Sequence, residues 1–80
     1  MNITPVVASL SDKPPSLKQA QEFCGGYVQM LWLDDDSQLL VNEDGRLKGL
    51  QVNKEASDRW PAWGQLLGNV MHLTGTARWT

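Results

Sequence analysis

The sequence contains few of the side chains from which cross-links and metal sites are built. Cys24 is the only cysteine and His72 the only histidine. A disulfide within the chain is therefore excluded, and a metal site made of cysteine and histidine would have only these two ligands. We expect neither a metal nor another cofactor. A single thiol is also typical of a reducing compartment.

The chain also lacks the apolar segments that direct proteins to membranes. Met1–Val7 has neither the charged start nor the long apolar core of a signal peptide. No apolar run approaches the length of a transmembrane helix. We therefore expect a soluble protein of the cytoplasm with no membrane partner.

An excess of positive charge is absent as well. The chain has 7 Lys and Arg against 9 Asp and Glu, a net charge of -2 and a pI near 5.1. This balance argues against a nucleic-acid partner. The exception would be a local basic patch, but its residues are interleaved with Glu55 and Asp58, which is typical of a solvated face. The patch would consist of Arg46, Lys48, Lys54 and Arg59.

The length of 80 residues predicts a single domain over residues 1–80. This is near the lower limit of what one hydrophobic core stabilises, because small chains bury a smaller fraction of their surface. Since disulfides are excluded, we expect additional stabilisation from packing or from self-association.

The first 15 residues predict an edge strand followed by a proline-rich loop. Ile3–Leu10 is apolar enough to form a strand, and Pro5 places it at a sheet edge because proline cannot donate to the ladder. A helix over Leu17–Phe23 follows, with Ser16 as its N-cap and Gly25-Gly26 as its stop. Leu17, Ala20 and Phe23 are expected to share one face of this helix.

The centre of the chain predicts a β-hairpin. Tyr27–Leu33 and Ser37–Val41 are strand-like, and Asp34–Asp36 forms the turn between them. Both faces of the first of these strands are mainly apolar, so both need a cover. A chain this short offers one helix for each face, or one helix and a partner molecule.

The last part predicts a connection, a helix and a strand. Asn42–Asn53 contains a turn, and Asn53 caps a short helix over Lys54–Arg59. Trp60–Gly64 is expected to be a loop, Leu66–Leu73 a strand, and Thr74–Thr80 a tail.

Together these elements predict an α+β fold with the order β-α-β-β-α-β. The sheet has three to four strands, mixed or antiparallel, and the two short helices lie on one face.

Two segments resemble the phage and prophage family of small proteins known as domain of unknown function 3846. These are Leu17–Val28 (LKQAQEFCGGYV) and Asn42–Leu50 (NEDGRLKGL), the latter followed by Asn53 and Ala56. The chain has Cys24 where members often have a valine-like residue, and it lacks a proline at the segment Gln51-Val52. Both departures favour structural roles. The resemblance implies this fold and a phage origin, hence a bacterial host cytoplasm. It supplies no activity and no catalytic residues.

Neither carboxylate cluster has the spacing of a metal site. The consecutive residues of Asp34–Asp36 at a hairpin tip point in different directions, which favours a solvated turn. Asn42–Gly45 is interpreted as a turn, although Glu43, Arg46 and Asn53 could converge on a ligand.

Catalytic side chains are not evident. His72 lies in an apolar strand without a neighbouring nucleophile, and Cys24 lies at a helix end where the dipole disfavours a thiolate. We therefore expect no catalytic residues and a protein that is not an enzyme. An enzyme would need a carboxylate pair assembled by the fold, such as Glu43 with Asp34 or Asp36.

Tryptophan is abundant, with Trp32, Trp60, Trp63 and Trp79 in a core too small to bury all four readily. Exposed tryptophan is enriched at binding surfaces, while ordinary core and rim packing is the alternative. The candidate binding residues are Tyr27, Trp32, Asn42, Glu43, Arg46, Lys48, Asn53, Trp60 and Trp63.

The leading hypothesis is a phage binding module that associates with itself and engages a host protein, including a component of host defence. The alternative is sequestration of a nucleotide-like ligand between protomers, with Tyr27 or a tryptophan for stacking and Arg46 or Lys48 for phosphate.

Overall fold

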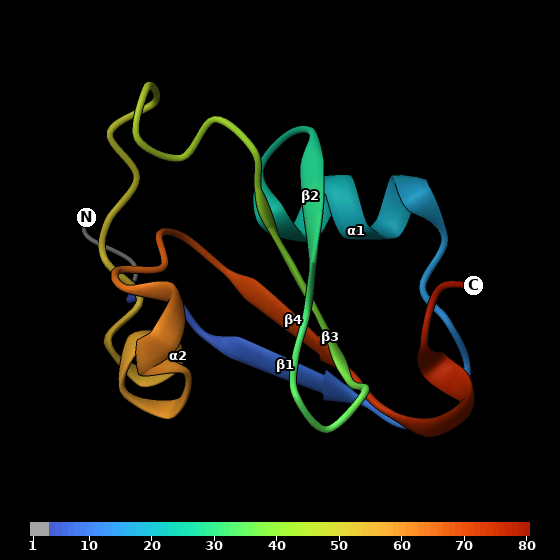
Figure 1. Ribbon diagram of the computed structural model, residues 1–80. Helices are drawn as coiled ribbons and strands as arrows, with labels where there is room; N and C mark the ends of the chain where they lie inside the picture. The colour runs from blue at the N-terminus through green and yellow to red at the C-terminus, as the bar shows by residue number, and fades with distance from the viewer. Residues whose placement is uncertain (1–3) are drawn as a thin grey trace.

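The computed structural model describes residues 4–80 and confirms the predicted α+β fold and its element order (Figure 1). A mixed four-stranded sheet carries two α-helices and two short 3-10 helices. The elements are β1 (Val7–Leu10), α1 (Leu17–Cys24), β2 (Val28–Trp32), β3 (Gln38–Asn42), α2 (Lys54–Arg59), η1 (Pro61–Trp63), β4 (Val70–Leu73) and η2 (Gly75–Ala77). Ile3, where the first strand was expected to begin, lies outside the described residues.

The strands are arranged in the order β1-β4-β3-β2. β2 and β3 form the predicted antiparallel hairpin, with Met30 opposite Leu40, and the turn lies at the three consecutive aspartates. β4 pairs antiparallel with β3 and parallel with β1. β1 is an edge strand, as the preceding Pro5 indicates.

β4 is shorter than the expected strand Leu66–Leu73. Gly68 has a φ of 75°, and this left-handed conformation interrupts an extended strand. Before it, Leu67 forms an isolated bridge with Val52 instead of extending β4.

α1 is bounded by the caps that the sequence predicts. The Ser16 side chain accepts from the Gln19 N–H, and the Gln19 side chain accepts from the Ser16 N–H, which completes a capping box. Gly25 ends the helix with a φ of 84°. Leu17, expected on one face with Ala20 and Phe23, is 57% exposed, and the buried residues of this helix are Ala20 and Cys24.

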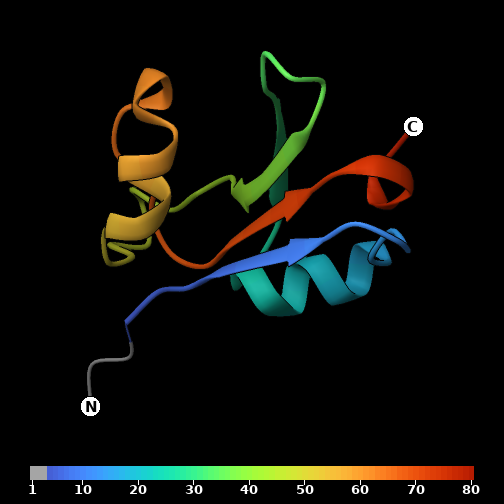
Figure 2. The ribbon, with the colours of Figure 1, turned by 90° about the horizontal axis from the view of Figure 1, so that it is seen from below.

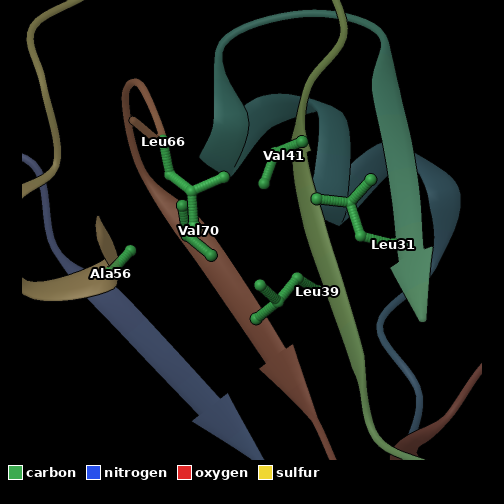
Figure 3. Close-up of a cluster of buried hydrophobic side chains, with 6 residues drawn as sticks. All are labelled: Leu31, Leu39, Val41, Ala56, Leu66 and Val70. Atoms are coloured by element: carbon green, nitrogen blue, oxygen red, sulfur yellow. The ribbon is translucent and has the colours of Figure 1, made fainter. Parts of the chain in front are cut away.

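The two α-helices lie on opposite faces of the sheet, so the expectation that both share one face is wrong and the option of one helix for each face is confirmed (Figure 2). The reason is β3, whose side chains are apolar toward both faces. Leu40 packs with Ala20 of α1, whereas Leu39 packs with Ala56 of α2. Figure 3 shows the α2-side core, which contains Leu31, Leu39, Val41, Ala56, Leu66 and Val70.

The C-terminal segment is packed against the body of the protein and is not the predicted tail. Ala77 in η2 is fully buried. The buried Gln38 side chain donates to the Trp79 carbonyl and accepts from the Trp79 N–H. The Trp79 indole N–H also donates to the Pro15 carbonyl at 2.9 Å. A buried amide must be hydrogen-bonded, and Gln38 finds its partners in this segment.

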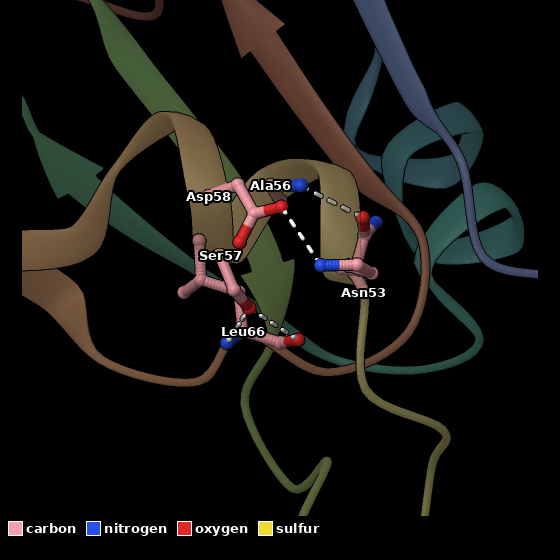
Figure 4. Close-up of polar contacts among 6 residues, drawn as sticks. Asn53, Ala56, Ser57, Asp58 and Leu66 are labelled. Carbon is pink, nitrogen blue, oxygen red and sulfur yellow. Dashed lines mark hydrogen bonds and ion pairs between the residues drawn. The ribbon is translucent and has the colours of Figure 1, made fainter.

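Asn53 caps α2 and also connects α2 to the sheet. Its Oδ1 accepts from the Ala56 N–H at 2.9 Å (Figure 4). Its Nδ2 donates to the carbonyls of Gly68 at 2.8 Å and Val6 at 3.1 Å. The side chain is fully buried. One side chain therefore fixes the start of α2 next to the beginnings of β1 and β4.

We predict that Asn53→Ala lowers the free energy of unfolding by about 2 to 4 kcal/mol, because it removes an N-cap and leaves two carbonyls without their donor. Urea denaturation measures this change. Gln51→Ala, at an exposed side chain nearby, is the control and is expected to change stability by less than about 0.5 kcal/mol. Equal stability of both variants would contradict the role given to Asn53.

Candidate functional site

The nine candidate binding residues do not form one site. Asn42 and Asn53 are buried and hydrogen-bonded within the protein. Tyr27 is 69% exposed just before β2 and lines none of the clefts described below. The three candidate tryptophans, in contrast, line one common cleft.

Asn42 and Lys48 hold the C-terminal end of α1. Asn42 Nδ2 donates to the Cys24 carbonyl at 2.9 Å, and its Oδ1 accepts from the Asp44 N–H at 2.8 Å. Lys48 Nζ donates to the Gly25 carbonyl at 3.1 Å. A cation and an amide donor at a helix C-terminus satisfy carbonyls that have no partner within the helix. In this structure both side chains therefore serve the scaffold.

The tryptophan cleft, defined by residues 32–35 and 59–63, has a volume of about 440 Å³. It lies between the end of the β2–β3 hairpin and the α2–η1 segment. Trp32 and Trp63 are 53% and 44% exposed, while Trp60 is half-buried against the α2-side core. Asp34, Asp35 and Arg59 supply the charged groups of its lining. The cleft thus combines open aromatic surface with both signs of charge.

Trp60 is held in place by two neighbours. The Arg59 guanidinium carbon lies 4.4 Å from the centre of its ring, a cation–π contact. The His72 ring lies 4.9 Å away with an interplanar angle of 60°. Arg59 is also 3.7 Å from Glu55 in an exposed i,i+4 ion pair, which is of low strength. Trp60 is therefore a fixed wall of the cleft.

Asp35, Ser37 and His72 form a hydrogen-bonded chain beside this wall. The Ser37 hydroxyl donates to Asp35 Oδ1, and the Ser37 N–H donates to the same atom at 3.0 Å. His72 Nε2 lies 3.1 Å from Ser37 Oγ. Because the only hydroxyl proton of Ser37 is given to Asp35, the histidine must be the donor in the second contact.

The hydrogen-bonded chain of Asp35, Ser37 and His72 is not arranged for nucleophilic catalysis. A catalytic serine gives its proton to the histidine, but here the Ser37 proton points to Asp35, and Ser37 itself is buried. The two bonds from Ser37 lower the pKa of Asp35, so this carboxylate stays charged. Burial, and then the positive charge of Arg59, lower the pKa of His72, although Asp35 opposes this effect. The hydrogen-bonded chain therefore fixes the turn, while burial and Arg59 favour the neutral form of His72.

A second cleft, the Arg46 cleft, lies near the other end of the hairpin and has a volume of about 310 Å³. Its lining includes Glu43, Asp44, Arg46 and also Trp63, which it shares with the tryptophan cleft. Neither of these two clefts contains Glu43 together with Asp34 or Asp36, so they do not assemble the carboxylate pair that an enzyme would need. Over residues 4–80, no group of three or more His, Cys, Asp and Glu side chains is placed to hold a metal ion.

Cys24 is a buried packing residue. Its Sγ donates to the Leu40 carbonyl at 3.6 Å. Burial raises the pKa of this thiol to about 11. It therefore stays protonated at neutral pH and is a poor nucleophile.

Arg59 and Asp35 line the tryptophan cleft, and Ser37 joins Asp35 to His72, but none of the three was a predicted binding residue. The only local signal was the adjacency of Arg59 to Trp60. Ser37 and His72 are 35 residues apart, and their contact depends on the pairing of β3 with β4.

The neutral state of His72 predicts a pH dependence of stability. Because its pKa is lowered in the folded protein, the unfolded chain binds a proton at a higher pH than the folded one does. The free energy of unfolding should therefore fall as the pH drops below the ordinary histidine value of about 6.5, until the folded histidine is also protonated. Urea denaturation at a series of pH values between about 7.5 and 5 measures this loss.

His72→Gln is the matched control for this prediction, because an amide still donates toward Ser37 but does not titrate. The chain has no other histidine. The loss between about pH 7 and 5 should therefore be much smaller in the variant. An equal loss in both proteins would assign it to carboxylates and contradict the prediction.

None of the helices within residues 4–80 is long and apolar enough to cross a membrane. Comparisons with curated proteins and with solved structures gave no significant match. Over residues 2–78, nearly its whole length, the chain matches the family described as Domain of unknown function (DUF3846). The protein is therefore a member of the DUF3846 family.

Proposed function

We propose that this protein is a non-enzymatic binding module that self-associates and engages a protein partner through the tryptophan cleft. One observation carries the proposal, which is that three tryptophans line a single open cleft. Trp32 comes from β2, Trp60 from the junction of α2 and η1, and Trp63 from η1. Two of these indoles keep about half of their surface exposed. Exposed tryptophan around a pocket is typical of the centre of a protein-binding surface.

The chemistry of the cleft supports binding over catalysis. Its histidine neighbour donates to Ser37, and the proton of that serine is directed to Asp35. Arg59 lies over the Trp60 ring and offers a charged group at the rim. These groups can orient a partner through hydrogen bonds and charge, while the indoles supply the apolar contact area.

The resemblance to phage and prophage proteins supports a specific setting for this binding. We propose that the protein is encoded by a phage or prophage, acts in the cytoplasm of the bacterial host, and binds a host protein such as a defence component. No membrane or nucleic-acid partner is part of this proposal.

We predict that Trp63→Ala abolishes retention of the partner while it leaves the fold intact, because Trp63 is exposed and lies outside both buried cores. Tagged wild-type protein and variant would be cross-linked in host lysate, and the retained proteins compared by quantitative mass spectrometry. Melting temperatures of the two proteins verify that the variant is folded.

Leu17→Ala is the control for this experiment, since it also truncates an exposed apolar side chain but on α1, away from the tryptophan cleft. The partner should be retained by the wild type and by Leu17→Ala, and lost by Trp63→Ala. Retention of the same proteins by all three chains would contradict the assignment of the cleft.

A nucleotide-like ligand is a second candidate, and one observation favours it. Trp63 and Arg46 line the same cleft, which places a stacking surface near a cation that can bind phosphate. Lys48 does not contribute, because it lies at the end of α1 and does not line this cleft.

For this candidate we predict that a bound nucleotide raises the melting temperature of the wild type by mass action, and that Arg46→Ala removes the rise. Thermal shift against a panel of nucleotides measures both effects. Lys48→Ala is the matched control and should still respond. A panel without any shift in the wild type would exclude this candidate.

A further inference from the structure

The outer side of β2 presents backbone groups for pairing. The Tyr27 carbonyl accepts from the Glu43 N–H at 2.8 Å, and the Leu33 N–H donates to the Ser37 carbonyl at 2.9 Å. In an antiparallel pair, residues that bond to the neighbouring strand alternate with residues that point away from it. Val28, Met30 and Trp32 therefore direct their N–H and C=O groups away from β3. No other described strand lies on that side.

This edge lacks the features that normally prevent pairing. The segment Tyr27–Leu33 contains no charged residue, no proline and no glycine. The opposite edge strand, β1, is preceded by Pro5. Proteins usually protect an exposed edge with charge, proline or a bulge, because its backbone groups otherwise recruit another strand.

We propose that β2 pairs antiparallel with β2 of a second copy of this chain, around a two-fold axis at Met30, so that the two sheets become one. The proposal rests on the self-association in the proposed function and names its surface. This register places Met30 opposite the second copy's Met30, and Val28 opposite the second copy's Trp32. All three outward-facing residues of each chain are then hydrogen-bonded, which a shifted register does not achieve.

The same register gives the exposed aromatic side chains apolar neighbours. Trp32, about half exposed in the single chain, faces the second copy's Val28. Tyr27, which is largely exposed, faces the second copy's Leu33. Aromatic side chains opposite branched aliphatic ones stabilise antiparallel pairs. Leu33 lines the tryptophan cleft, so the second copy contributes Tyr27 to the wall of the binding site.

Charge complementarity at both ends of the paired strands supports the same register. In this register Asp34, which follows β2 in one chain, lies opposite Gly26 of the second copy. Lys48 lies beside this glycine, since its Nζ is 3.1 Å from the Gly25 oxygen and a Cβ on Gly26 would come within 2.3 Å of Nζ. Each lysine is thus placed near an aspartate of the other copy.

A backbone N-methyl group at Met30 tests the pairing directly. It removes the outward N–H without changing a side chain, and Cys24 allows the full chain to be assembled by ligation of two peptides. Sedimentation over a concentration series should show a dimer for the unmodified synthetic chain. The dissociation constant of the methylated dimer should be at least about tenfold higher. The two-fold symmetry brings one methyl group from each copy, so two hydrogen bonds between the copies are lost. Circular dichroism compares the folds.

Charge reversal supplies a second test that needs no synthetic chemistry. Lys48→Glu should weaken the dimer, and the double variant Lys48→Glu/Asp34→Lys should restore it, because the attraction is re-established with the signs exchanged. This comparison decides the proposal if the methylated chain does not fold.

Two results would overturn the pairing, and they differ in what they say about the proposed function. A wild type that is monomeric at all concentrations would exclude both self-association and the β2 interface. A dimer that is unaffected by the methyl group and by Lys48→Glu would exclude only the interface. Binding in the tryptophan cleft is tested separately by Trp63→Ala.

Discussion

The structure depends on β3, a five-residue strand in which every residue is buried. Leu39 and Val41 require a cover on one face of the sheet and Leu40 on the other, because apolar surface left in water costs free energy. The buried side chains of its two polar residues, Gln38 and Asn42, need hydrogen-bond partners inside the protein. Gln38 is bonded to Trp79, and Asn42 to Cys24 and Asp44. Within residues 4–80 no buried side-chain nitrogen or oxygen lacks a hydrogen-bond partner.

These requirements explain why the candidate site lies where it does. α1, with eight residues, covers one face together with the C-terminal segment. α2, with six residues, covers only part of the other face, and Trp60 and Leu66 extend its cover. The tryptophan cleft opens between this partial cover and the end of the hairpin. Large aromatic side chains at such a boundary can contribute to the core and to a binding surface at once.

Local signals in the sequence were sufficient for the two α-helices, their caps and the β2–β3 hairpin. Ser16 and Asn53 act as N-caps, and Gly25 ends α1, because these roles depend on residues only a few positions away. Long-range contacts could not be predicted in this way. The tail prediction failed because the C-terminal segment is held by the hydrogen bond between Trp79 and Gln38. These residues are 41 positions apart in the sequence. The apolar residues on both faces of Tyr27–Leu33 correctly indicate a cover for each face, whereas the order of the elements alone favours helices on one face.

The candidate site was predictable in its residue types but not in its geometry. An abundance of tryptophan pointed to Trp32, Trp60 and Trp63, whereas their convergence depends on the packing of α2 against the sheet. Asn42 and Asn53 were plausible ligand contacts for the same reason that makes them good scaffold residues. An amide both donates and accepts, so it can satisfy a helix end and a neighbouring strand together. Only their burial distinguishes the two roles.

β2 connects the two proposed binding events. Trp32 ends this strand and lines the tryptophan cleft, while its backbone groups belong to the open edge. A partner in the cleft would therefore contact the same residue that the second copy contacts, and the second copy's Tyr27 would lie beside that partner. Binding free energies are linked reciprocally, so any stabilisation of the dimer by the partner must be matched by tighter partner binding to the dimer. If both proposed binding events occur, a single short strand would couple assembly to recognition in a chain of 80 residues.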